Sequence, residues 1–395
     1  MTPAKRPRTE SPAMSDARAG LKRRVAGVVA ESRDELIGIS RHLHANPEIR
    51  WQEHGSVTYL ADRLRASGFA VEVGAGGLET AFVASRGTGA RKVAFVAEYD
   101  ALEGLGHACG HNIIAAAGVG AGIALASLAD ELDLTVIVVG TPAEEGGGGK
   151  IPMLEAGVFD DLEFAMMVHP GPADSVYARP FAVAHFDVGY EGFSAHAAAY
   201  PHLGVNASDA MLVAQVAIGL LRQQLPSTVR VHGIVREAGT APNAIPDSAR
   251  GSWYVRASSM EELQATLERV SRCFEAGAIA TGCSWNLTET SPRYDVFRND
   301  EPLARAFAAN AAELGRDMDL HERGAGGMNT ASTDMGNISQ RVRAIHPYLS
   351  IDSLPVVNHQ AGFADAAITP AADRALLEGA TLLAQTAVDG LIAAD

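Results

Sequence analysis

The chain has 395 residues, of which 47% are hydrophobic and 20% charged, and its formal net charge is −15. That length predicts two domains, each able to bury its own core, and the composition is typical of a globular protein. The negative charge disfavours nucleic acid as a partner, because phosphates attract Lys and Arg. No apolar run approaches the roughly 18 residues of a membrane span, so we expect no membrane association.

Cysteine usage indicates a reducing compartment. The three cysteines (Cys109, Cys273 and Cys283) cannot all pair, and a chain of this size needs no disulfides. We therefore expect a cytoplasmic protein. Residues 1–20 lack the apolar core of a signal peptide and are predicted to be a disordered tail. The KRPR segment in this tail is compatible with a nuclear-import patch, although a solvated tail is the simpler interpretation.

Apolar, β-rich runs alternate with helical segments after the tail. Residues 21–46 are predicted to form an amphipathic helix that ends before Pro47. Strands are predicted at 92–97, 134–140 and 164–170, and a helix rich in small residues at 112–129. Continuous apolar strands separated by helices predict an α/β fold with a mainly parallel sheet and helices on both faces.

The pattern changes near Ala182, where apolar and polar residues begin to alternate along the predicted strands, as they do in half-exposed strands. Four strands and two long helices then follow in the order β-α-β-β-α-β, which is typical of a small ferredoxin-like domain. Patterning of the first kind resumes after this segment. We therefore predict an inserted domain at 183–293, within a larger domain formed by residues 21–182 and 294–395.

Side chains that bind metal ions follow three consecutive predicted strands. The carboxyl ends of parallel strands meet at one edge of a sheet, where binding sites form. The residues at these ends, and in one loop near the C-terminus, are Glu98, Asp100, His107, Cys109, His111, Glu144, Glu145, His169 and His359. Cysteine, histidine and carboxylate are the ligands that zinc and similar divalent ions prefer. Of the adjacent Glu144 and Glu145, one could bind metal while the other acts as general base.

Other interpretations of these residues stay open at this point. A lone His169 is usually a structural histidine, and a lone Glu-Glu pair is usually a solvated loop. A cysteine amidase with Cys109 as nucleophile and His107 or His111 as base would use part of the same set. A non-catalytic metal- or amino-acid-binding protein is a third candidate, but binding alone requires no second glutamate beside the first. The pattern favours a metal site and does not name the reaction.

Six motifs carry a resemblance to a known family: GHACGHN, TPAEEGGGGK, VHPG, SAHAAAYP, PNAIPD and STDMGN. They resemble the metal-dependent peptidases and amidohydrolases that include aminoacylase, acetylornithine deacetylase and glutamate carboxypeptidase. Within that family, EYDALEGLGHACGHN, LRQQLPSTVRVHGI and STDMGNIS are most similar to the dipeptidases that cleave β-alanyl-lysine and Xaa-Arg, with aminobenzoyl-glutamate hydrolase as a near relative. The likeness runs from about Leu36 to the C-terminus.

The resemblance implies a centre of two divalent ions, zinc or manganese. The implied ligands are Cys109, His111, Glu145, His169 and His359. Cys109 stands where much of the family has a bridging aspartate, so its thiolate would be shared between the ions. Glu144 would be the general base, and Asp100 would orient a ligand imidazole. Cys109 is then a ligand and not a nucleophile.

The inserted domain resembles the family's lid and dimerisation domain. This likeness implies a homodimer in which His196 reaches into the partner subunit's site and stabilises the oxyanion. Asn243 would help to hold the substrate, and Arg256 is a candidate for binding its carboxylate. By spacing alone, His196 is a surface histidine and Arg256 a solvated charge. Residues 324–334 are expected to line the substrate pocket.

The implied reaction is hydrolysis of an amide bond in a small dipeptide or N-acyl amino acid, by a metal-activated water. The branch favours dipeptides with a basic C-terminal residue, with aminobenzoyl-glutamate and N-acyl amino acids as alternatives. Two positions depart from the pattern. Glu98 stands where many members have a metal-binding histidine, and Glu103 stands where the dipeptidase branch is expected to have proline. Glu98 or His107 is expected to lie beside the ligands, and Glu103 at the site rim.

Overall fold

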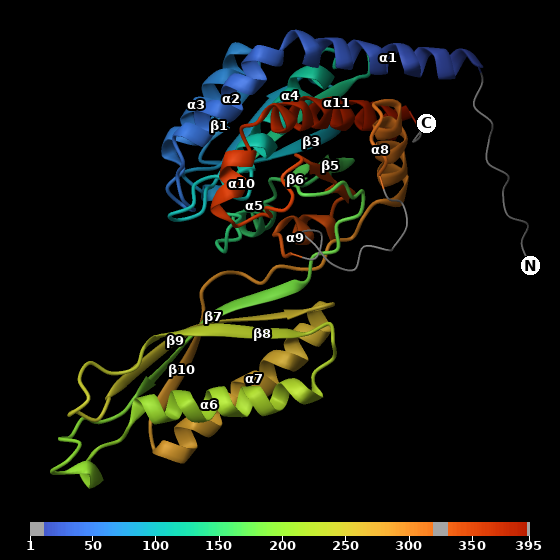
Figure 1. The fold of residues 1–395 in the computed structure, drawn as a ribbon. Helices are drawn as coiled ribbons and strands as arrows, with labels where there is room; N and C mark the ends of the chain where they lie inside the picture. The colour runs from blue at the N-terminus through green and yellow to red at the C-terminus, as the bar shows by residue number, and fades with distance from the viewer. Residues whose placement is uncertain (1–11, 319–330, 393–395) are drawn as a thin grey trace, which may run out of the picture.

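The computed structural model describes residues 12–318 and 331–392, which form two units joined by two chain segments (Figure 1). The larger unit contains a six-stranded sheet in the order β1-β2-β4-β3-β5-β11. These strands are β1 (Ala70–Val73), β2 (Phe82–Arg86), β3 (Arg91–Glu98), β4 (Leu134–Thr141), β5 (Phe164–Met166) and β11 (Ala344–Ile345). The pairs β3/β4, β3/β5 and β5/β11 are parallel, which confirms the predicted mainly parallel sheet. The antiparallel β1 and β2 at its edge were not predicted.

Successive side chains of the buried strands point to opposite faces of this sheet, and both faces are apolar. Helices cover both faces and bury these side chains in two cores. In β3, Phe95 joins one core and Val96 the other. The first core is covered by α1 (Pro12–Glu31), α2 (Arg33–Ala45), α3 (His54–Ala66), α4 (His111–Ala126), α8 (Glu301–Glu313), α10 (Ala361–Ala366) and α11 (Pro370–Ile392). The second is covered by α5 (Lys150–Glu155) and α9 (Met335–Ser339).

A short parallel pair forms a separate two-stranded sheet next to the main one. β6 (His169–Gly171) pairs with β12 (Tyr348–Ser350). The predicted strand at 164–170 is thus two short strands, β5 and β6, in separate sheets. This break leaves His169 at the start of β6, beyond the carboxyl end of the main sheet.

The N-terminal helix begins earlier than expected. Residues 12–20, predicted to belong to a disordered tail, are the first part of α1, while residues 1–11 of that tail lie outside the described residues. Apolar Val25 and Val29 of this helix are buried in the core, and Lys22 Nζ lies 3.4 Å from Asp389 Oδ2 in α11. Residues 12–20 thus extend a helix that is anchored further along, and within this extension Arg18 Nε lies 3.7 Å from Asp389 Oδ1. The predicted helix 21–46 is in fact two helices, α1 and α2, that meet at Ser32.

Helix α11 corrects the expectation that no segment has the length of a membrane span. Among the described helices it alone is long and apolar enough, by length and composition, to cross a membrane. However, 72% of its most apolar window is buried, and the helix packs against α1, α4 and α8. Burial in the core therefore accounts for its apolar composition.

The smaller unit has the predicted β-α-β-β-α-β order. Its elements are β7 (Ala182–Glu191), α6 (Ala207–Leu221), β8 (Arg230–Glu237), β9 (Ser248–Ala257), α7 (Met260–Thr281) and β10 (Ser284–Glu289). The four antiparallel strands lie in the order β10-β7-β9-β8, and both helices cover one face (Figure 1). Trp253 and Val255 of β9 are buried on that face, so Tyr254 and Arg256 lie on the opposite face. That opposite face carries side chains towards the larger unit.

Close packing of α4 on the sheet gives a test of this fold. A Cβ atom added at Gly122 in α4 would lie 2.3 Å from Cγ2 of Val138 in β4. We expect Gly122→Val to lower the free energy of unfolding by about 2–3 kcal/mol, because a well-packed core accepts extra carbon atoms only by shifting. The urea midpoint of the purified protein measures this loss.

Gly27 in α1 provides the matched control, since an added Cβ there meets nothing within 4 Å. Gly27→Ala is expected to stabilise the protein by about 0.5–1 kcal/mol through helix propensity. Equal midpoints for the two variants would contradict the described contact between α4 and β4.

Candidate metal centre

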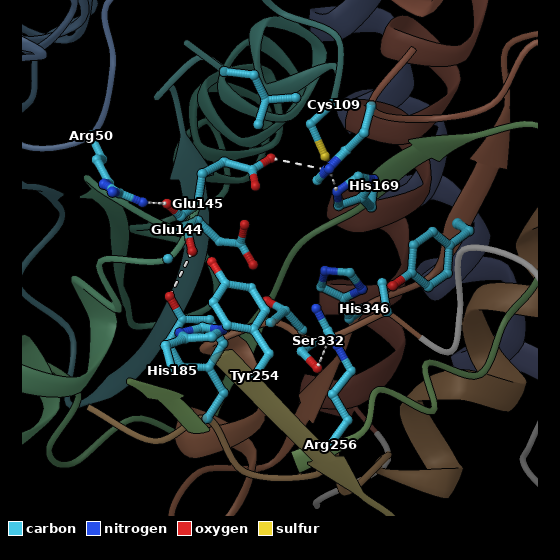
Figure 2. A pocket seen from close by; sticks show the side chains of 17 residues that line it. Arg50, Cys109, Glu144, Glu145, His169, His185, Tyr254, Arg256, Ser332 and His346 are labelled. Atoms are coloured by element: carbon cyan, nitrogen blue, oxygen red, sulfur yellow. Dashed lines mark hydrogen bonds and ion pairs between the residues drawn. The ribbon is translucent and has the colours of Figure 1, made fainter. Parts of the chain in front are cut away.

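A cavity of about 300 Å³ lies between the carboxyl edge of the main sheet and the strands of the smaller unit. Figure 2 shows Glu144 and Glu145 on one side of this cavity and Cys109 and His169 on the other. His185, Tyr254 and Arg256 line it from β7 and β9. Residues of both units therefore form one pocket.

The predicted ligands gather into overlapping groups of metal-type donors. Cys109, His111 and His169 form one group, and Cys109, Glu145 and His359 form another. Within each group the donor atoms lie within 4.8 Å of one another. The Cys109 sulfur belongs to both, and its Sγ lies 3.6 Å from His169 Nε2. This is the arrangement expected of a thiolate that two ions share.

Neighbouring acceptors orient the two buried imidazoles. Nδ1 of His111 donates to Asp100 Oδ1 at 3.0 Å, and Nδ1 of His169 donates to the carbonyl of Pro170 at 2.8 Å. Both rings therefore direct Nε2 towards the donor groups. Burial alone would raise the pKa of Asp100, but the adjacent His111 lowers it below the ordinary value, so Asp100 is a carboxylate at neutral pH.

Two unsatisfied atoms test whether a divalent ion fits these residues. His111 Nε2 and Glu98 Oε2 are buried 3.6 Å apart, and neither has a hydrogen-bond partner within the described ranges. Buried polar atoms without partners are costly, and coordination to a cation would satisfy them. His111 belongs to donor groups with Cys109 and with Glu145, so a divalent ion fits these residues, whereas Glu98 belongs to none of these groups and ion-pairs with Lys150.

Glu144 is buried in a third donor group with His111 and Glu145, and no lysine or arginine within the described ranges forms an ion pair with it. Burial, and then the charges of Glu98 and Glu145, raise the pKa of Glu144 well above its ordinary value. Its Oε2 lies 4.0 Å from His111 Nε2. A carboxyl group whose pKa is raised binds a proton more strongly than an ordinary glutamate, which suits a general base.

A buried lysine that the sequence analysis did not assign lies behind the site. Lys150 Nζ is 2.6 Å from Asp334 Oδ1 and 2.7 Å from Glu98 Oε1, and all three side chains are at most 1% exposed. The ammonium group thus compensates two carboxylates next to the donor groups. Asp334 lies in the STDMGN motif, which was recognised without a role for this residue.

Other expected residues lie in different places. His196 and Asn243 are exposed on the smaller unit and do not line the cavity, although Ala197 N donates to Asn243 O at 2.9 Å and so holds the two loops together. Glu103 is exposed, and His107 is buried with its ring 6.3 Å from that of His44, outside the donor groups.

Arg256 does line the cavity, where its Nη1 donates to Ser332 Oγ at 2.5 Å. Of the predicted pocket loop 324–334, residues 324–330 lie outside the described ranges, whereas Ala331, Ser332 and Thr333 line the cavity. Pocket residues that the sequence analysis missed include Arg50, His185, Tyr254, Tyr294, His346 and Tyr348.

An α/β sheet whose carboxyl edge holds Cys, His and carboxylate donors next to a spare glutamate defines a metal-dependent hydrolase. Residues 90–388 match the family model described as peptidase family M20/M25/M40. The chain belongs to this peptidase family.

Relatives of known sequence or structure agree with this assignment. The chain is 41% identical to Xaa-Arg dipeptidase of Mus musculus over 93% of its own length and 88% of that protein's. It is 32% identical to a p-aminobenzoyl-glutamate hydrolase chain of Escherichia coli, over 64% of this chain and 57% of that one. A dinuclear metal-binding M20 peptidase from Bacillus subtilis has the same fold, with a TM-score of 0.67 and 23% identity over 91% of this chain and 98% of that one.

The charge compensation by Lys150 can be tested by its removal. Lys150→Met leaves Glu98 and Asp334 as buried carboxylates without their shared cation, so we expect a loss of about 3–5 kcal/mol in the free energy of unfolding. Chemical denaturation of the metal-free protein measures this loss without a contribution from bound ions.

Arg250 supplies the control, because its ion pair with Glu191 at 2.8 Å is exposed. Arg250→Met should cost no more than about 1 kcal/mol. If Lys150→Met is as stable as Arg250→Met, the buried lysine does not compensate the two acids.

Proposed function

We propose that this chain is a metallo-dipeptidase that cleaves dipeptides with a basic C-terminal residue. The observation that carries the proposal is the Cys109 sulfur, which belongs to two donor groups beside Glu144 in one pocket. The likeness to Xaa-Arg dipeptidase of Mus musculus, at 41% identity over most of both chains, supports the substrate class.

A second candidate is hydrolysis of aminobenzoyl-glutamate or another N-acyl amino acid. Arg50 and Arg256 both line the pocket, and neither forms an ion pair with an acid in the described part of the chain. Only Glu144 and Glu145 contribute carboxylates to the described lining. Two arginines without acidic partners favour an anionic substrate, and one of them is sufficient for the C-terminal carboxylate of any dipeptide.

The cofactor would be two divalent ions, zinc or manganese, held by Cys109, His111, Glu145, His169 and His359. When bound, such ions supply positive charge to a carbonyl oxygen and lower the pKa of water towards about 7. Glu144 would accept a proton from the attacking water and donate it to the leaving amine. Arg256 would hold the substrate carboxylate, and the smaller unit would cover the pocket and exclude bulk water.

A homodimer would complete the site. Nδ1 of His196 accepts hydrogen bonds from Ala198 N and Ala199 N, which leaves Nε2 protonated as a free donor for the oxyanion of a partner subunit. On α6, Leu212, Val216 and Leu220 recur every four residues and are 57–69% exposed. An apolar stripe of this kind on the smaller unit suits contact with a second copy.

We also propose a cytoplasmic location, without nucleic-acid or membrane partners. Cys109, Cys273 and Cys283 are all free thiols, which supports a reducing compartment. The net charge of −15 supports the absence of nucleic acid as a partner.

The role of Glu144 can be separated from metal binding. Glu144→Gln is expected to lower kcat by about 10³-fold, because the amide cannot accept the proton, while the metal content of the purified protein stays at the wild-type value. Glu155→Gln, an exposed change at the end of α5, is the matched control and should keep full activity. Full activity of Glu144→Gln would show that another group is the base.

The substrate class and metal dependence can be tested in one panel. We expect metal-loaded enzyme to release amines from β-alanyl-lysine and alanyl-arginine faster than from aminobenzoyl-glutamate or N-acetyl amino acids, and chelation to abolish all release. Preference for aminobenzoyl-glutamate would favour the second candidate. Turnover that survives chelation would contradict the metal mechanism and favour Cys109 as a nucleophile.

A further inference from the structure

The residue before the candidate general base has an unusual backbone conformation. Ala143 has φ of 57°, in the left-handed region that costs a residue with a Cβ about 1–2 kcal/mol. It lies between the end of β4 and Glu144, so its conformation decides the direction in which the chain enters the pocket. Such strain persists only where surrounding contacts hold it in place.

Glu53 supplies that contact from a distant part of the sequence. Its side chain is 0% exposed, and its Oε1 accepts a hydrogen bond from Ala143 N at 2.8 Å. Its Oε2 accepts from Thr80 Oγ1 at 2.9 Å, which fixes the carboxyl group from the other side. Glu53 had no role in the sequence analysis, because it lies 90 positions from Ala143.

The next peptide groups are held as well. The carbonyl of Glu144 accepts from Tyr294 Oη at 2.7 Å, and Glu145 N donates to Asp100 Oδ2 at 2.9 Å. Glu53 therefore anchors the side of Glu144 nearer the N-terminus, while Asp100 anchors the other side. Of these two acids, only Asp100 also touches a candidate metal ligand side chain, His111.

We propose that Glu53 is a positioning residue for the general base, which holds Ala143 in its left-handed conformation and so fixes the direction of the Glu144 side chain. This inference rests on the proposed role of Glu144. Within the described residues Glu53 forms no ion pair, and burial, followed by the charge of Asp100, raises its pKa to about 7. Burial and the charge of Asp100 therefore disfavour the ionised carboxylate of Glu53, and the hydrogen bonds that it accepts from Ala143 N and Thr80 Oγ1 partly offset this cost.

Glu53→Ala removes the acceptor for Ala143 N. We expect kcat to fall about 100-fold, because small misplacements of a catalytic group have effects of this size. KM and metal content should stay within about twofold of wild type, since Glu53 touches neither the pocket nor a ligand side chain. Glu53→Gln should keep kcat within about fivefold, because the amide oxygen can accept the same hydrogen bond.

Thr80→Val is the matched control. It removes the other contact of the same buried carboxyl group and leaves Ala143 N bonded. We expect a loss of thermal stability similar to that of Glu53→Ala, with kcat close to wild type. A merely structural role for Glu53 would instead affect both variants equally.

Wild-type kcat in folded, metal-loaded Glu53→Ala would overturn the proposal, and so would equal losses of kcat in Glu53→Ala and Thr80→Val. If Glu53→Ala fails to fold, Glu53→Asp replaces it, because the shorter side chain also withdraws the acceptor. Equal kcat for Glu53→Asp and Glu53→Gln would then overturn it. Retained turnover in Glu144→Gln would remove the proposed base instead, and this result separates failure of the function from failure of the Glu53 inference.

Discussion

The position of the Cys109 sulfur between two groups of donors is the constraint on which the rest of the site depends. The sulfur can meet His111 and His169 on one side and Glu145 and His359 on the other only if the loop after β3 lies directly against β6. Gly110 makes this approach possible. Its φ is 86°, and a Cβ there would lie 2.4 Å from Cγ of Pro170. The same glycine is the N-cap of α4 and so sets where His111 begins that helix.

The negative charge of the site arises because the same strand ends and loops bring several acids together. Five acids from separate parts of the chain meet there, with Glu144 and Glu145 in the pocket lining and Glu98, Asp100 and Asp334 buried behind it. Among the described lysines and arginines, only Lys150 forms ion pairs with these acids. A buried group of acids with so little compensation is stabilised by further positive charge, which bound divalent ions would provide. Their affinity and the stability of the fold are therefore linked.

Sequence patterns were sufficient to predict those features that depend on the residues of a single helix, strand or strand end. The parallel strands and the donors at their carboxyl ends follow from local apolar runs, and the rule for sheet edges brings Cys109, Glu145 and His169 together. The order of elements in the smaller unit is likewise local. By contrast, Lys150 and Asp334 are 184 positions apart, and nothing in either segment indicates that the two side chains meet in the core. Glu53 and Ala143 escaped notice for the same reason. The early start of α1 extends a helix that Val25 and Val29 anchor in the core, since residues 14–17 are themselves exposed. The position of His196 relative to a second copy is not a property of one chain.

Titration of metal-free protein with cobalt(II) tests the shared thiolate most directly. A Cys109 thiolate that binds both ions predicts thiolate-to-cobalt charge-transfer absorption that increases through two equivalents of metal. The same absorption should be absent from Cys109→Ser, even though Cys273 and Cys283 remain as free thiols. Cobalt that binds without this absorption, or with equal absorption in Cys109→Ser, would contradict the role of Cys109 as the ligand common to the two groups.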